Sequence, residues 1–63
     1  MKKYYADLYD DSFEILDTEN HDTVYCGKFT DIGIEDNDPD FTNKMDRFLE
    51  TELGIAPNEW EIG

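Results

Sequence analysis

Two residues in this sequence have side chains typical of nucleophile–base pairs and metal sites, and each type occurs once. Cys26 is the only cysteine and His21 is the only histidine. A reactive thiol needs a neighbouring base and surroundings that lower its pKa. The alternation of residues 23–29 predicts that Cys26 faces the buried side of a strand, whereas His21 lies in a turn. We therefore expect no catalytic pair, no Cys/His zinc site and no disulfide within the chain.

Residues 36–40 (DNDPD) have the acidic spacing found at the start of a calcium-binding loop. Such a loop has Gly at its sixth position and Glu at its twelfth, and Phe41 and Arg47 stand there instead. The same residues suit the beginning of a helix. Asp38 can accept hydrogen bonds from first-turn amides, and Pro39 fits the first helical position. We expect neither a metal site nor a cofactor.

The charge of the chain is strongly one-sided. Seventeen Asp and Glu residues against five Lys and Arg give a net charge of −12 in 63 residues. Close carboxylates are therefore common by composition alone, whereas acid–base catalysis needs a cleft that separates two pKa values. A chain this short seldom encloses one, so we do not expect an enzyme. The charge repels nucleic acid and anionic membranes and favours basic partners.

One helix and one small sheet must position these charges, as a single acidic α+β domain spanning residues 1–63. Residues 38–55 predict the helix, because their apolar residues recur on one stripe. The stripe consists of Phe41, Met45, Phe48, Leu49 and Leu53. Gly54 can adopt the left-handed conformation that ends a helix, and Ile55 can fold back on the last turn. A helix of this length is marginal alone, so we expect the stripe to pack on the sheet with Phe48 at its centre.

Three alternating stretches, residues 3–9, 12–17 and 23–29, predict a three-stranded antiparallel meander packed on this helix. Residues 58–62 fit either a short fourth strand at the C-terminus or a tail laid over the core. Symmetric turns would pair Leu8 with Phe13, Ala6 with Ile15, and Ile15 with Cys26. These pairs would form the apolar face that meets the helix.

On the opposite face, the same register places Asp7 across from Glu14. Like charges directly opposite each other destabilise a sheet by a few tenths to about 1 kcal/mol. Either the two carboxylates separate into solvent, or Lys3 or Lys28 screens them, or the negative charge serves a function.

An apolar row accompanies this pair on the same outer face. The row consists of Tyr5, Leu16 and Tyr25, and a row of this kind rimmed by carboxylates is typical of a partner surface. The alternative is that Trp60 and Ile62, or a second copy of the chain, cover it.

Two functions fit these features. The first is an inhibitor that imitates DNA, which carries about one charge per 3.4 Å along each strand. Carboxylates two residues apart on a strand lie about 6.6 Å apart, so a rigid domain can present them at phosphate-like intervals. In size and charge the chain is similar to small acidic proteins of phages and mobile elements that block CRISPR, restriction or DNA-repair enzymes. The expected partner-binding residues are Tyr5, Asp7, Glu14, Leu16, Tyr25, Glu35, Asp36, Asp38 and Asp40.

The second function is a non-enzymatic interaction module or accessory subunit whose acidity only keeps it in solution. Its partner would dock on the same apolar row or on the edge of the sheet. For either function the sequence lacks an apolar run of membrane length and a signal-peptide core, so we expect a cytoplasmic protein without membrane contact. A core this small would gain stability from a partner or from a homodimer.

Overall fold

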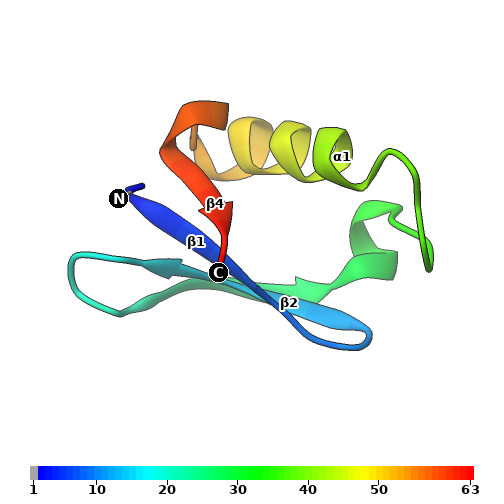
Figure 1. The fold of residues 1–63 in the computed structure, drawn as a ribbon, viewed down its shortest axis with the longest axis horizontal. Coiled ribbons are helices and arrows are strands. Elements are labelled where there is room, and N and C mark those ends of the chain that lie inside the picture. Colours follow the sequence, from blue (N-terminus) through cyan, green and yellow to red (C-terminus); the bar gives the residue numbers. More distant parts are fainter. Residues whose placement is uncertain (1) are drawn as a thin grey trace.

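Four strands form the sheet, and helix α1 lies over one of its faces (Figure 1). The structure is a computed structural model that describes residues 2–63. The strands are β1 (Tyr4–Leu8), β2 (Ser12–Asp17), β3 (Thr23–Lys28) and β4 (Trp60–Ile62), in the order β3-β2-β1-β4. Neighbours β1–β2 and β2–β3 are antiparallel, whereas β4 runs parallel to β1.

The predicted α+β class is confirmed, but the sheet is not a three-stranded antiparallel meander. Strands β1, β2 and β3 pair antiparallel in chain order, and β4 adds a fourth, parallel strand that makes the sheet mixed. The physical reason lies in the helix. It crosses over the sheet and returns the chain to the starting end of β1, so the last strand enters in the same direction as β1. The alternative of a C-terminal strand at residues 58–62 holds for Trp60–Ile62.

The helical layer begins later than the sequence predicts. Helix α1 spans Phe41–Phe48, and a wider helical turn, η2 (Leu49–Leu53), continues it. The Asp38 carboxylate accepts a hydrogen bond from the Asp40 amide at 2.9 Å, one turn before the helix, and Pro39 also precedes it. The expected Asp38 cap and Pro39 helical position are therefore wrong, because the chain forms a separate turn here.

The end of the helical layer agrees with the prediction. Gly54 has a φ of 68°, in the left-handed region that glycine tolerates best. The Ile55 amide then donates to the Leu49 carbonyl at 3.0 Å, and the Ile55 side chain is buried.

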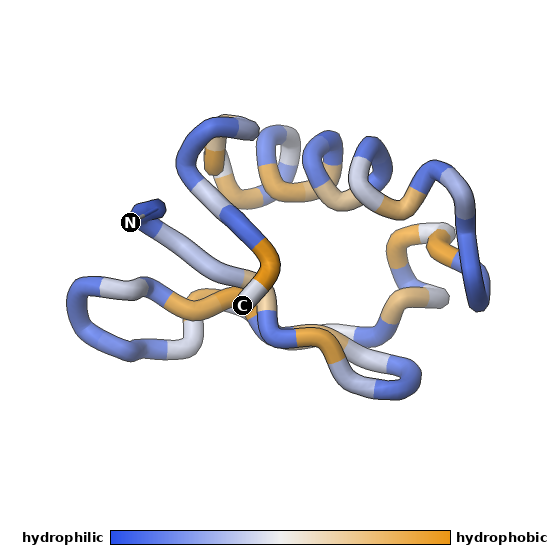
Figure 2. Tube along the Cα trace, viewed as in Figure 1, coloured by the Kyte–Doolittle hydropathy of each residue, from blue (hydrophilic) through white to orange (hydrophobic). Residues whose placement is uncertain are grey.

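The core lies between the two layers, where the apolar side of α1 faces the sheet (Figure 2). Of the predicted stripe, Met45 and Leu49 are completely buried, while Phe48 is only partly buried. Phe48 is therefore not the centre of the helix–sheet contact. The buried core residues are Ala6, Phe13, Ile15, Ile34, Met45, Leu49, Ile55 and Trp60.

The predicted register between β1 and β2 is confirmed, including Asp7 opposite Glu14. The predicted register between β2 and β3 is wrong, because Ile15 pairs with Tyr25 rather than with Cys26. The pairing shifts by one residue between Ile15 and Leu16, which leaves Val24 without a partner. Such a β-bulge reverses the faces of the following side chains, and symmetric closure of the turn cannot anticipate it.

The bulge moves Tyr25 to the helix-facing side of the sheet. Its ring centroid lies 5.7 Å from that of Phe13 and 5.1 Å from that of Phe48. Gly27 leaves room for this ring, since a Cβ atom there would lie 2.8 Å from the Tyr25 hydroxyl. Cys26 pairs with Glu14 on the outer face and is exposed, so the prediction of a buried thiol is wrong.

Two short 3-10 turns complete the chain, η1 (Phe29–Ile32) after β3 and η3 (Pro57–Glu59) before β4. Within residues 2–63, no helix has both the length and the apolar character required to cross a membrane.

Candidate partner-binding surface

The outer face of the sheet is open, because no element of residues 2–63 lies over the side opposite α1 (Figure 1). Trp60 is buried in the core, so it does not cover this face. Tyr5 and Leu16 pair directly across β1 and β2, as predicted, and both remain partly exposed. Tyr5 also lines a shallow hollow with His21 and the terminal strand. The outer apolar row is therefore Tyr5 and Leu16, and the assignment of Tyr25 to it is wrong.

Neutral hydroxyl groups hold the Glu14 carboxylate opposite Asp7. Oε1 accepts a hydrogen bond from the Tyr9 hydroxyl at 3.0 Å, and Oε2 accepts one from the Thr23 hydroxyl at 2.6 Å. The Thr23 bond and then the Tyr9 bond lower the pKa of Glu14, because both stabilise its charged form. The bond to Glu14 also raises the pKa of Tyr9.

No direct salt bridge among the described residues neutralises this pair. Among residues 2–63, neither Lys3 nor Lys28 forms a salt bridge with Asp7 or Glu14. The Glu14 carboxylate is not free in solvent either, because both of its oxygens accept hydrogen bonds. Neutral hydroxyl groups therefore hold the Glu14 carboxylate in place and leave its negative charge intact.

The acidic stretch before the helix divides into structural and exposed carboxylates. Asp38 accepts hydrogen bonds from the amides of Glu35 and Asp40 and from the Lys44 ammonium group at 2.6 Å. These bonds, with Lys44 first, lower the pKa of Asp38 to about 2. The Asp38 side chain is only 6% exposed. Of the predicted residues here, Glu35, Asp36 and Asp40 are exposed, whereas Asp38 holds the loop together.

The tertiary structure brings this stretch to the same end of the molecule as the turn between β1 and β2 (Figure 1). One groove is lined from both segments, by Asp10 of the turn and by Glu35 and Asp36 of the loop. Asp10 is not among the residues predicted from the sequence to bind a partner. A pair of aspartates at the tip of a hairpin was the available signal, but nothing local indicated which other carboxylates it would join.

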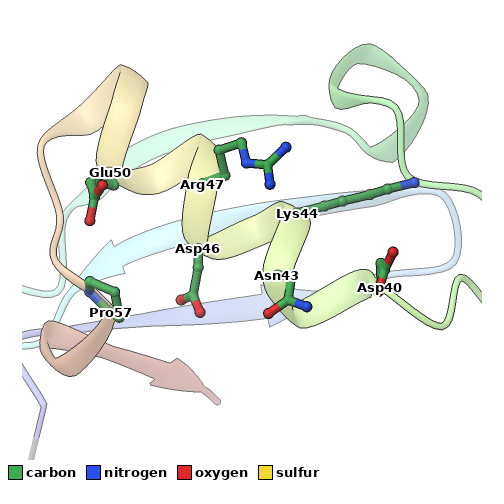
Figure 3. A pocket seen from close by; sticks show the side chains of 7 residues that line it. All are labelled: Asp40, Asn43, Lys44, Asp46, Arg47, Glu50 and Pro57. Atoms are coloured by element: carbon green, nitrogen blue, oxygen red, sulfur yellow. The ribbon is translucent and has the colours of Figure 1, made fainter.

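The outward side of α1 has a different character. Figure 3 shows a polar hollow lined by Asp40 before α1, by residues of α1, by Glu50 of η2 and by Pro57 of η3. Asp46 in this hollow accepts a hydrogen bond from the Trp60 indole at 2.6 Å, and Lys44 reaches away to the Gly33 carbonyl and to Asp38. Arg47 and Lys44 place positive charge here. The hollow is therefore mixed in sign, and it borders the acidic loop at Asp40.

No group of three or more His, Cys, Asp or Glu residues among residues 2–63 is arranged to hold a metal ion. His21 lies in the turn before β3 with a φ of 58°. Comparison of the whole chain with protein-family models, with curated proteins and with solved structures finds no match in any of the three.

Proposed function

We propose that this protein is a small acidic inhibitor that binds a nucleic-acid-binding protein in place of DNA and blocks it without chemistry. The observation that supports this most is the Asp7–Glu14 pair. Two carboxylates face each other on an open sheet, and Glu14 is fixed by neutral hydroxyls that leave its charge intact. A sheet selected for stability alone gains nothing from this pair, because opposed like charges destabilise the ladder.

The geometry of the Asp7–Glu14 pair suits a protein surface that binds DNA phosphates. Directly opposed residues have Cβ atoms about 4.5–5.5 Å apart, so the two negative charges lie close together on the sheet. Glu61 lies next to Tyr5 on β4 and extends the acidic surface along the sheet. Tyr5 and Leu16 add apolar contact that salt does not screen, as the centre of an interface requires.

The exposed loop carboxylates act at longer range. Glu35, Asp36 and Asp40 would steer a basic partner toward the sheet, so they affect association more than dissociation. Asp38 contributes least, because Lys44 already pairs with it. The proposed targets are CRISPR effector, restriction or DNA-repair enzymes, which such an inhibitor would meet in the cytoplasm.

Affinity capture from a host lysate tests this function. The bait is compared with Asp7→Asn/Glu14→Gln and with the matched control Glu50→Gln/Glu52→Gln, which removes equal charge from exposed helix positions. We expect the parent and the control to retain a nucleic-acid-binding enzyme that added duplex DNA displaces, and the Asp7/Glu14 variant to lose it. Retention by all three baits, or capture that DNA does not displace, would contradict the proposal.

Surface plasmon resonance on the captured enzyme then separates the two acidic surfaces. Asp7→Asn/Glu14→Gln should mainly speed dissociation, because it removes contacts at the centre. Glu35→Gln/Asp36→Asn should mainly slow association and flatten its salt dependence. If the first variant binds like the parent while the second fails, the loop rather than the sheet is the binding centre.

One observation favours the second candidate function, an accessory module. β3 lies at the edge of the sheet and contains no Asp or Glu in its six residues. A partner strand could pair with this edge through backbone hydrogen bonds. Binding of that kind would depend little on salt and would not compete with DNA, so the capture experiment also distinguishes the two functions.

A further inference from the structure

A groove at the acidic end of the molecule combines an apolar lining with unpaired charge. Its apolar lining comes from Leu8, Phe29, Ile34 and Phe41. Leu8 is 38% exposed, which is high for a leucine beside a core. The rings of Phe29 and Phe41 meet edge to face with centroids 5.7 Å apart, and both are only partly buried.

Three exposed carboxylates border this lining, those of Asp10, Glu35 and Asp36. The fourth carboxylate of the groove, Asp38, is already neutralised by Lys44. Among residues 2–63, no lysine or arginine forms a salt bridge with the other three. The groove therefore has a surplus of negative charge directly beside exposed aromatic and aliphatic surface.

From this combination we propose that the groove binds an arginine side chain presented by the protein's partner. The aliphatic stem would lie on Leu8 and the two phenylalanines, and the guanidinium group would reach the carboxylates. The proposal deepens the proposed function and rests on it for the basic character of the partner. Arginine residues that contact phosphate are common in nucleic-acid-binding proteins.

Arginine fits this groove better than lysine for two physical reasons. Its guanidinium group is planar and weakly hydrated, so it can stack on an aromatic ring while donating several hydrogen bonds to carboxylates. A lysine ammonium group is more strongly hydrated, so it would retain its bound water and fit less well against an apolar lining.

The groove also connects to the sheet surface through Tyr9. Tyr9 lines the groove, and its hydroxyl group donates to Glu14 on the outer face. A partner that places one arginine in the groove can therefore meet the Asp7–Glu14 pair with neighbouring residues.

Titration of the ¹⁵N-labelled protein with a capped Gly-Arg-Gly peptide tests the proposal by NMR. We expect shifts of the amides of Leu8, Asp10, Glu35, Asp36 and Phe41. A capped peptide with citrulline, the neutral analogue of arginine, should cause much smaller shifts at these positions, and a lysine peptide should fall between the two. Equal shifts with citrulline and arginine, or shifts elsewhere only, would overturn the proposal.

The variant Asp10→Asn/Glu35→Gln/Asp36→Asn provides the second test, with Asp31→Asn/Glu50→Gln/Glu52→Gln as the matched control of equal charge. Each exposed ion pair contributes roughly 1.4-fold to 5-fold in affinity. Loss of three should weaken the arginine peptide about tenfold, whereas the control should weaken it far less. Equal weakening by both variants would mean that net charge alone, and not the groove, attracts the peptide.

These tests fail independently of the proposed function. If the peptide binds in the groove but DNA does not compete for the captured partner, the DNA-mimic function is refuted and the arginine-binding groove is supported. If DNA competes for the captured partner but the peptide does not bind in the groove, the DNA-mimic function is supported and the arginine-binding groove is refuted.

Discussion

The position of Tyr25 gives the sharpest test of the fold, because it decides which side chains are left on the outer face. In the structure its ring lies 5.1 Å from Phe48 of α1, at an interplanar angle of 56°. Aromatic pairs at this separation are worth about 0.5–1.5 kcal/mol beyond their buried area. A double-mutant cycle with Tyr25→Leu and Phe48→Leu should therefore give a coupling free energy of about 1 kcal/mol.

Leucine is the suitable replacement, because it keeps both positions apolar. A domain of this length has an unfolding free energy of roughly 3–9 kcal/mol, so alanine at two aromatic positions risks complete unfolding. Urea denaturation followed by circular dichroism and by Trp60 fluorescence measures each unfolding free energy. Coincidence of the two signals checks that unfolding is two-state.

Tyr5→Leu is the matched control, since it changes the same residue type on the other face of the sheet. With Phe48→Leu it should be additive within about 0.5 kcal/mol, because the two side chains share no contact. Coupling of Phe48 to Tyr5 and not to Tyr25 would refute the bulge and return Tyr25 to the outer row.

The remaining predictions concern stability. Leu49→Ala, at a completely buried position, should lower the unfolding free energy in urea by about 2–5 kcal/mol, while Met45→Leu should change it by less than about 1.5 kcal/mol. The pKa of Asp38, lowered from 3.8 to about 2, means that its stabilisation is present above pH 3.8 and is lost as the pH falls toward 2. Asp38→Asn should therefore lower the melting temperature at pH 7 and have a shrinking effect below pH 4. Raising sodium chloride from tens to hundreds of millimolar should raise the melting temperature, because ions screen the excess of negative charge. Calcium should act no more strongly than magnesium at equal ionic strength, and a large calcium-specific shift would reveal a metal site at residues 36–40.

The first hairpin and the helix stripe were predictable because their determinants are local. The alternation in residues 4–8 and 12–17 agrees with one register across a short turn, and the structure has that register. The apolar spacing of the helix likewise selected Met45 and Leu49 for the core. The predicted start of the helix was wrong because the Asp38 carboxylate can accept hydrogen bonds from amides of the first helical turn or from amides of a separate turn before the helix. Its contact with Lys44, six residues later, belongs to the second arrangement.

Part of the candidate partner-binding surface was likewise predictable from local sequence, and part depended on the tertiary structure. Asp7, Glu14, Tyr5 and Leu16 lie together on the outer face because one local register places them there. The hydroxyls that hold Glu14 come from Tyr9 and from Thr23 on the neighbouring strand. The bond from Thr23 depends on the register between β2 and β3. The alternation of residues along the strands predicted a different register.

The sequence by itself determined the charge of the chain, the period of each element and the face of each side chain within the first hairpin. These properties depend on neighbouring residues and on fixed repeats of backbone geometry. The tertiary structure decided three further features. It placed Tyr25 inside, it set β4 parallel to β1, and it joined Asp10 to the acidic loop. Each of these features brings together residues that are far apart in the chain. A one-residue bulge or a crossover is favoured only by the packing that it makes possible, such as that of Tyr25 against Phe48.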